Sequence, residues 1–135
     1  MDRHLPQTLK LSSSPQNIST VLHYLEGISK NYCLTPDKHF DVVTCITEAV
    51  NNAIVHGNAC DCNKSVHLRV LQKKDVLAFH VSDEGNGFDF ENLPDPTSSE
   101  RLERLGGRGV YLIRQLTHRV SFRNNGSTVE MEFKL

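Results

Sequence analysis

The sequence has little of several features that mark particular classes of protein. Lysine and arginine number 15 against 16 aspartate and glutamate residues, a formal charge of -1, so the basic excess typical of proteins bound to phosphate backbones is missing. No apolar run approaches the roughly 18 residues of a membrane span, and Met1 leads into no apolar segment of a secretory signal. We therefore expect a cytoplasmic protein whose partners are neither nucleic acids nor membranes.

Cysteine is also scarce and irregularly spaced. The four cysteines have no framework spacing, and a domain with 38% apolar residues does not need disulfide bridges to hold a core. We expect reduced thiols at Cys33, Cys45, Cys60 and Cys62. A chain of 135 residues is long enough for one ordinary domain and too short for two, so residues 1–135 are predicted to form a single domain.

Three common catalytic motifs are absent. No Gly-Lys-Ser or Gly-Lys-Thr completes a Walker loop, and no Gly-x-Gly-x-x-Gly follows the first predicted strand. The Gly-x-Ser-x-Gly elbow of serine hydrolases is missing as well. These absences argue against P-loop nucleotide binding, dinucleotide binding and nucleophilic serine catalysis.

Apolar spacing predicts two helices after a short strand at residues 8–11. Apolar residues recur every three or four positions over residues 16–30, which is typical of an amphipathic helix. A second helix begins after Thr35, where a capping hydroxyl, a proline and an acidic residue follow one another, and Gly57 ends it. Its apolar face is predicted to comprise Phe40, Val43, Val50 and Ile54.

The rest of the chain predicts two hairpins separated by a loop and a helix. Two β-rich runs, 65–71 and 76–83, form the first hairpin, and runs 120–123 and 128–135 flank an Asn-Gly turn signal that predicts the second. Residues 91–105 are rich in proline, serine and charge, which indicates a flexible loop before a helix that begins near residue 106. This order of elements favours an α+β two-layer sandwich.

The second helix carries polar residues beside its apolar face. Glu48 and Asn52 are four residues apart, so their side chains emerge on one face and can share a ligand. A carboxylate beside an amide oxygen suits Mg²⁺ bound to phosphates. Two alternatives stay open: Glu48 acts as a base away from the metal, or both residues are simply solvated.

Two glycine-rich segments add further candidates. Asp83 is followed by alternating glycines at Gly85 and Gly87, a pattern that lets backbone approach a flat ligand while the carboxylate accepts a hydrogen bond, for instance from an adenine amino group. A plain turn is the alternative. Residues 106–109 precede a helix and offer free amides to an anion, with Arg108 able to add a guanidinium.

A zinc site is a third, weaker possibility. His56, Cys60, Cys62 and His67 fall within one short stretch, and histidine and cysteine are the usual zinc ligands. Cys-x-Cys, however, matches the usual Cys-x-x-Cys knuckle poorly. A zinc-dependent interaction module therefore remains one of the alternatives.

Taken in order, residues 48–57, 83–87 and 106–113 resemble the three ATP-binding boxes of the GHKL superfamily, which includes gyrase, histidine-kinase catalytic domains and heat-shock chaperones. Within it, the chain is most similar to the small anti-sigma factor serine/threonine kinases of bacteria. The resemblance covers nearly the whole length. It implies the histidine-kinase-like ATPase fold, with helices on one face of a mixed, mostly antiparallel sheet.

The resemblance also implies roles for individual residues. Glu48 matches the base that accepts a proton from a substrate hydroxyl, Asn52 the magnesium ligand, and Asp83 the adenine-reading aspartate. Residues 91–105 resemble the ATP lid. Gly85 and Gly87 match the positions that shape the adenine pocket, Thr128 matches a hydroxyl near the adenine, and Gly107 and Gly109 match the glycines around the phosphates. His56 and Arg108 complete the expected nucleotide-binding residues.

The activity that this resemblance implies is transfer of the γ-phosphate of Mg-ATP to a serine or threonine of a small anti-sigma factor antagonist. Sequestration of a sigma factor accompanies it, and a homodimer is one assembly open to the chain. The alternative from another class is a non-catalytic nucleotide switch that binds a partner only in its ATP form.

Overall fold

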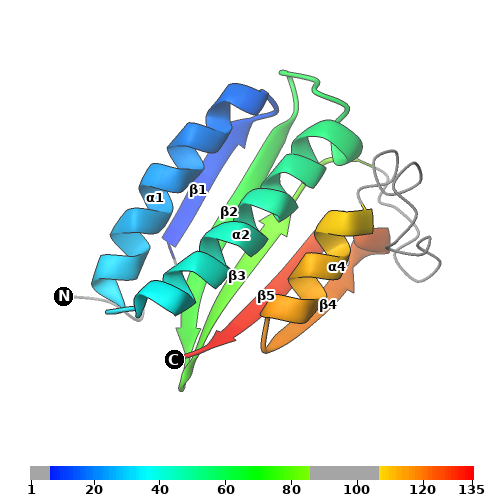
Figure 1. The fold of residues 1–135 in the computed structure, drawn as a ribbon. Helices are drawn as coiled ribbons and strands as arrows, with labels where there is room; N and C mark the ends of the chain where they lie inside the picture. The colour runs from blue at the N-terminus through cyan, green and yellow to red at the C-terminus, as the bar shows by residue number, and fades with distance from the viewer. Residues whose placement is uncertain (1–6, 86–106) are drawn as a thin grey trace.

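The computed structural model describes residues 7–85 and 107–135 (Figure 1). The expected order of strands, helices and hairpins is confirmed over these residues. In chain order the elements are β1 (Gln7–Ser12), η1 (Pro15–Asn17), α1 (Ile18–Asn31), α2 (Pro36–Asn52), η2 (Ala53–Gly57), β2 (Ser65–Lys73), β3 (Val76–Ser82), α4 (Gly107–Leu116), β4 (Arg119–Arg123), η3 (Asn124–Gly126) and β5 (Thr128–Lys134). The predicted loop at 91–105 lies outside the described residues.

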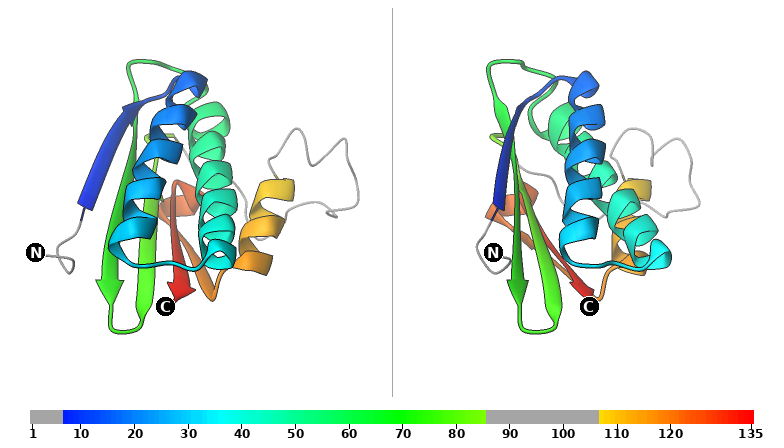
Figure 2. Two further views of the ribbon diagram at one scale, coloured as in Figure 1. Left: turned by 60° about the vertical axis from the view of Figure 1, so that its left-hand side comes forward. Right: turned by 90° about the vertical axis from the view of Figure 1, so that its left-hand side faces the viewer.

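The described strands form one sheet in the order β1-β2-β3-β5-β4. Helices α1, α2 and α4 all cover the same face, so the predicted two-layer sandwich is confirmed (Figure 2). All four pairings are antiparallel, whereas we expected a mixed sheet. The reason is visible in Figure 1: α1 and α2 run along the sheet and back, so β2 starts at the end where β1 finishes.

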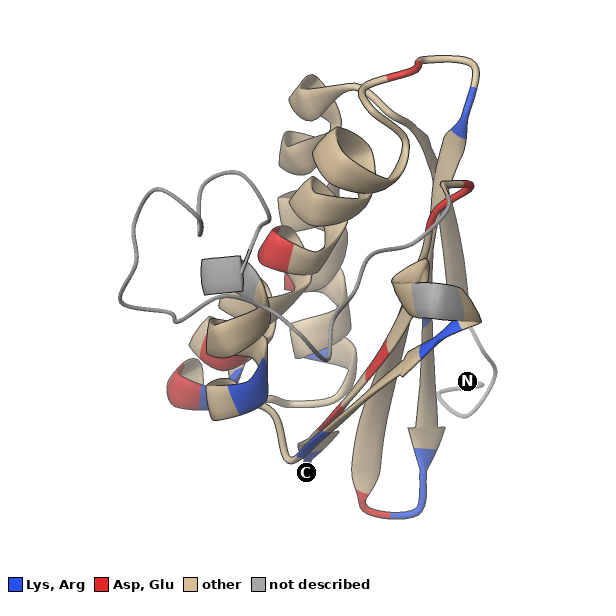
Figure 3. Cartoon of the chain, turned by 90° about the vertical axis from the view of Figure 1, so that its right-hand side faces the viewer, with Lys and Arg blue, Asp and Glu red and all other residues tan. Residues whose placement is uncertain are grey.

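Charge is distributed over both layers. The side of the molecule in Figure 3 carries acidic and basic positions on the helices and on the strands. This agrees with the near-balance of charge in the sequence. Among the described helices, none is long and apolar enough to cross a membrane.

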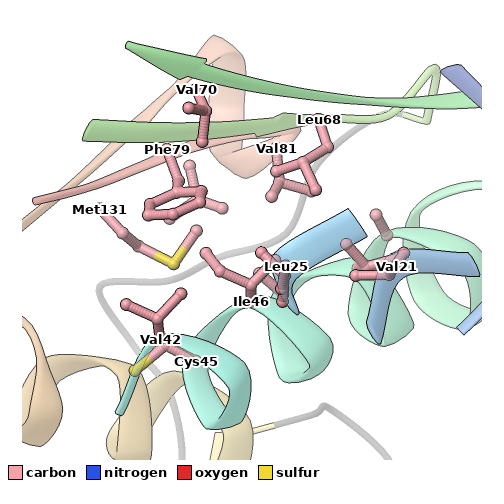
Figure 4. Packing of buried hydrophobic residues seen from close by; sticks show 14 of the residues in the cluster. Val21, Leu25, Val42, Cys45, Ile46, Leu68, Val70, Phe79, Val81 and Met131 are labelled. Atoms are coloured by element: carbon pink, nitrogen blue, oxygen red, sulfur yellow. The ribbon is translucent and has the colours of Figure 1, made fainter. Parts of the chain in front are cut away.

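The core lies between the sheet and the three helices (Figure 4). Val21 and Leu25 of α1 point toward the strands, and Phe79 packs edge to face on Phe133 at a centroid distance of 5.7 Å. Each large aliphatic side chain buried in this way stabilises the fold by about 1.5–3 kcal/mol. The core therefore holds the site elements in place without a disulfide: all four cysteines are free thiols.

The apolar face predicted for α2 is wrong at one end. Phe40 is 66% exposed, although Val50 and Ile54 are buried as expected and Val43 packs partly against the core. The buried face also includes Val42, which lies two residues from Phe40 and therefore about 200° around the helix. Two overlapping stripes fit the spacing in α2, and only contact with the sheet selects between them.

The ends of α2 match their sequence signals. The Thr35 side chain accepts a hydrogen bond from the Lys38 amide at 3.2 Å, and Pro36 opens the helix. At the other end α2 widens into the π-helical turn η2, which finishes at Gly57. The helical segment thus continues past the end of α2 at Asn52 and ends at the predicted Gly57, which lies against Asp83 at the end of β3.

Candidate functional site

A pocket opens between α2 with η2, α4 and the strand ends of the sheet. The space free of protein atoms there, counted together with the part open to solvent, is about 560 Å³. Its lining is apolar, apart from a few convergent polar groups. The residues around it are Ala49, Asn52, Ala53, His56, Gly57, Val81, Asp83, Val110, Ile113, Phe122, Gly126, Ser127 and Val129.

Three of the predicted site residues meet in this pocket. Asn52 and His56 reach it from one face of α2 and η2, and Asp83 reaches it from the end of β3. Glu48 is half-buried one turn before Asn52 and is not part of the lining. The small side chains of Ala49 and Ala53 leave the space that a ligand would fill.

Asp83 is held by its own backbone and by its neighbours. Its Oδ1 accepts a hydrogen bond from the Gly85 amide at 2.8 Å, and its amide donates to the Ser127 carbonyl at 2.9 Å. Burial raises the pKa of the Asp83 carboxyl, while the Gly85 hydrogen bond and the charge of Lys64 act in the opposite direction. A half-buried carboxylate that accepts one hydrogen bond from the described residues can accept another from a ligand N–H group.

Two glycines allow the end of η2 to lie directly on the Asp83 segment. A Cβ atom at Gly57 would lie 2.4 Å from the Asp83 carboxyl carbon. A Cβ atom at Gly85 would lie 1.9 Å from the Gly57 carbonyl oxygen. The glycine spacing after Asp83 suggested that the backbone there lies very close to a neighbour. This close approach is present at Gly85, where the neighbour is the backbone of Gly57.

The glycine-rich segment before the last helix leads into a helix N-terminus. Gly107 begins α4, and Val110 and Ile113 in its first two turns line the pocket. The predicted phosphate-binding residues Gly107 and Gly109 therefore lie in the first turn above the pocket. Gly87, the lid at 91–105 and the side chain of Arg108 lie outside the described residues.

Thr128 is not part of the pocket lining. Its hydroxyl donates to the Ser82 hydroxyl at 3.2 Å and accepts from the Asn124 side chain at 3.3 Å. Ser127 and Val129 line the pocket instead. The role of Thr128 at the adenine stays a prediction. Ser127, which was not predicted from the sequence, lines the pocket, and its hydroxyl donates to the Asn124 carbonyl at 2.9 Å.

Asn58 was also missed. It is fully buried, it follows Gly57 directly, and its side chain hydrogen-bonds to three other segments of the chain. A polar residue immediately after a helix-ending glycine was the only signal for it in the sequence.

The predicted zinc ligands do not form a site. In the described part of the chain, no group of three or more histidine, cysteine, aspartate or glutamate side chains is placed to hold a metal ion. Cys60 and Cys62 are exposed in the loop after η2, and His67 alternates with the buried Val66 and Leu68 on β2. His67 therefore faces away from the helix layer, and the zinc-dependent module is wrong.

Comparison with known proteins identifies the family. The profile of the histidine kinase-like ATPase domain matches residues 11–133, which is almost the whole chain. The matched range includes all the elements that line the pocket. The chain belongs to this family. The histidine kinase-like ATPase fold expected from the three sequence boxes is thus confirmed.

Several relatives within this family are named as kinases or anti-sigma factors. The serine-protein kinase RsbW of Bacillus subtilis is 32% identical over 130 residues, covering 91% of this chain and 81% of that protein. The serine/threonine-protein kinase BtrW of Bordetella bronchiseptica is 26% identical, covering 85% and 82%. An anti-sigma F factor of Clostridium perfringens is 39% identical over 71 residues, 49% of each chain.

A solved structure supports the same fold. The RsbU and RsbW domains of a Mycobacterium tuberculosis protein superpose with a TM-score of 0.68 at 19% identity. The match covers 97% of this chain and 32% of that longer one. Membership of a histidine kinase-like ATPase family implies ATP as the ligand, and the pocket offers groups that fit it: an apolar floor, one carboxylate, one amide side chain and a helix N-terminus above.

Proposed function

We propose that this protein is a serine/threonine protein kinase of the anti-sigma factor type. It transfers the γ-phosphoryl group of ATP to a hydroxyl of a small antagonist protein and sequesters a sigma factor. The observation that carries the proposal is the meeting of Asn52 and Asp83 in one pocket beneath the start of α4. Relatives named as kinases, which this chain matches over most of its length, support it.

Asp83 is assigned to the adenine end of the nucleotide. Its half-buried carboxylate accepts a hydrogen bond from the exocyclic amino group of the base. The apolar side chains of Val81, Val110 and Val129 line the same pocket and provide surfaces for the flat ring. Gly57 lets the backbone of η2 lie flat beside the carboxylate, so the base meets no side chain there.

Asn52 is assigned to the phosphate end. Its amide oxygen is a hard ligand of the kind that Mg²⁺ accepts beside water and phosphate oxygens. Bound Mg²⁺ neutralises charge on the triphosphate. The free amides of the first turn of α4, at Gly107 and Gly109, supply a second source of positive potential for the phosphates.

Glu48 is assigned as the base. The substrate hydroxyl oxygen forms a bond to the γ-phosphorus, the bond from that phosphorus to the bridging oxygen of ADP breaks, and Glu48 takes the hydroxyl proton. Most of the rate comes from positioning, since little covalent chemistry is left to the protein. One helical turn separates Glu48 from Asn52, a separation that suits a base beside the phosphate end.

The alternative function is a nucleotide switch without catalysis. The absence of Glu48 from the pocket lining favours it, because a base must come within hydrogen-bond reach of the hydroxyl proton. In this reading ATP changes the affinity for a partner protein and no phosphate moves. The two functions share the same nucleotide site and differ only at Glu48.

The deciding experiment follows the transfer of label from γ-labelled Mg-ATP into the proteins of a lysate of the source organism. The lysate is first treated with phosphatase, and the phosphatase is then removed. Wild type should label one small protein, and Glu48→Gln should bind ATP equally well but transfer phosphate about 100-fold or more slowly. Glu26→Gln, an exposed change on α1, is the matched control and should behave as wild type. Confirmed ATP binding without labelling by wild type would contradict kinase activity and favour the switch.

A further inference from the structure

A buried polar cluster lies directly behind the pocket, with Asn58 at its centre. The Asn58 side chain is 0% exposed. Its Oδ1 accepts a hydrogen bond from the Glu84 amide at 2.8 Å, and its Nδ2 donates to the Ser13 hydroxyl at 2.8 Å and the Ser65 carbonyl at 3.0 Å. Every polar group of the side chain is therefore engaged, as burial requires.

The partners of Asn58 are themselves tied together. The Ser13 hydroxyl donates to the Lys64 carbonyl at 2.8 Å, and the Glu84 carboxylate accepts a hydrogen bond from the Ser65 amide. The cluster thus joins the end of β1, the end of η2, the start of β2 and the segment after β3. We call these residues, Ser13, Asn58, Lys64, Ser65 and Glu84, the Asn58 cluster.

The cluster is covalently adjacent to the site. Glu84 follows Asp83, and Asn58 follows Gly57, whose Cα hydrogens face the Asp83 carboxyl. The bond from Asn58 Oδ1 to the Glu84 amide consequently ties together the two backbone segments whose contact sets the position of Asp83. A shift of one segment against the other would move the carboxylate relative to Asn52 on the opposite wall.

We propose that Asn58 is a positioning residue that holds the Asp83 carboxylate in the pocket and so sets the affinity and the base selectivity of the nucleotide site. The nucleotide part rests on the proposed function. The positioning itself is a property of the free protein, because every contact that carries it lies within the chain. Asn58 touches no ligand; it acts through Glu84 and Gly57.

The two ends of the Asn58 side chain have separable roles. Oδ1 faces the Asp83 segment, whereas Nδ2 faces β1 and β2. Asn58→Ala removes both ends, and Ser13→Ala removes one partner of Nδ2 while leaving the bond to Glu84 intact. If Asn58 had only a structural role, both variants would lower the stability of the protein, and the properties of the nucleotide site would change equally in both.

The test without ligand measures hydrogen exchange of the Glu84 amide and the pKa of the Asp83 carboxyl by NMR. In Asn58→Ala the protection of the Glu84 amide should fall about tenfold or more. The pKa of Asp83 should fall toward its ordinary value as water reaches the carboxyl. Ser13→Ala should lower the urea midpoint and leave both quantities unchanged. Equal changes in the two variants, or an unprotected Glu84 amide in wild type, would overturn the proposal.

The test with ligand measures ATP and GTP affinities by calorimetry, well below the melting temperature. Asn58→Ala should lower the affinity for ATP about tenfold and reduce the preference for ATP over GTP. Ser13→Ala should leave both affinities as in wild type. Unchanged affinities in a folded Asn58→Ala variant would also overturn the proposal. Failure of wild type to bind ATP would contradict the proposed function, and the amide-exchange result would still decide the role of Asn58.

Asn58→Asp is the conservative variant. It keeps an oxygen for the Glu84 amide and loses both donations from Nδ2. If it folds, ATP affinity and Glu84 protection should return toward wild type although stability is reduced. If it does not fold, the comparison of Asn58→Ala with Ser13→Ala decides alone.

Discussion

Two carboxylates in this small domain have their pKa values shifted in opposite directions. Asp83 is half-buried, no cation among the described residues forms an ion pair with it, and burial raises its pKa. Burial also acts on Glu130, but the Lys73 hydrogen bond and the charges of His80, Lys73 and Arg123 outweigh it and lower the pKa of Glu130. Glu130 has two cationic partners within the chain, whereas the raised pKa of Asp83 is a feature that often marks functional groups.

Asp83→Asn is expected to raise stability and to weaken ATP binding. Because its pKa is raised in the folded state, ionised Asp83 destabilises the fold above that pKa, and the penalty vanishes below the pKa of the unfolded chain. At pH 7 the melting temperature should therefore rise by roughly 1–4 °C. The affinity for ATP should fall about tenfold. The affinity for GTP should fall less, because the side-chain amide N–H introduced by the substitution can donate to the guanine carbonyl.

Melting curves from pH 7 down to acid and nucleotide titrations at pH 7 check this prediction. The stability difference between wild type and Asp83→Asn should shrink as the pH falls and Asp83 takes up its proton. A melting temperature below that of wild type at pH 7, or equal losses for ATP and GTP, would contradict the assignment of Asp83.

The helix α2 joins stability and function in one element. Its inner face packs on the sheet, its first turn is capped by Thr35, and Asn52 lies in its last turn at the pocket. Pro36 and Asn52 are the first and last of the 17 residues of α2, so the cap and the site lie about 24 Å apart at the usual helical rise. A change at the cap should reach the site only by unfolding the helix.

Thr35→Ala should cost about 1 kcal/mol of unfolding free energy, since it removes the bond to the Lys38 amide. Urea denaturation measures that loss, and ATP affinity at low temperature should stay as in wild type. Thr20→Ala, an exposed threonine in α1, is the control and should change stability by less than about 0.5 kcal/mol. A large loss of affinity in Thr35→Ala would mean that the two ends of α2 are coupled.

On the scale of the whole molecule, the sheet face away from the helices is held together by Glu130. This carboxylate, on β5, contacts Lys73 on β2 and Arg123 on β4 at 2.6 Å each, and His80 on β3 lies 3.3 Å away. Glu130 is 4% exposed. Its contacts with Lys73 and Arg123 therefore link β2, β4 and β5 by charge on a face that no described helix covers.

Glu130→Gln should lower stability at pH 7 by about 1–2 kcal/mol. The loss is smaller than for a fully buried pair because Lys73 and Arg123 are 46% and 59% exposed. Since the pKa of Glu130 is lowered by folding, its contribution is complete above the unfolded pKa and disappears as the pH falls through the folded one. The two proteins should converge in acid.

Urea denaturation between pH 7 and pH 3 measures the convergence. Glu132→Gln is the matched control, on the same face of β5 but 3.9 Å from Lys73, and it should lose less than about 0.5 kcal/mol. A constant difference between Glu130→Gln and wild type over this pH range would show that packing, and not charge, stabilises that face.

Local signals were enough to predict the elements of this protein. The cap at Thr35, the end of the continuous helical segment α2–η2 at Gly57 and the two hairpins depend on neighbours in the chain, and each was found where the sequence indicates it. The exposure of Phe40 was not predictable in this way, because spacing defines possible apolar faces of a helix and only the sheet chooses one.

In the candidate site, too, some features follow from the local sequence and others from tertiary contacts. The sequence by itself determined the α+β order, the family boxes and the residue types at Asn52 and Asp83, since backbone propensity and chemical type are local properties. Only the tertiary structure decided that Glu48 stays out of the pocket lining, that Ser127 lines the pocket beside Thr128, and that the buried Asn58 bonds to the residue after Asp83. Those facts depend on contacts between segments far apart in the chain, and spacing along one segment carries no information about them.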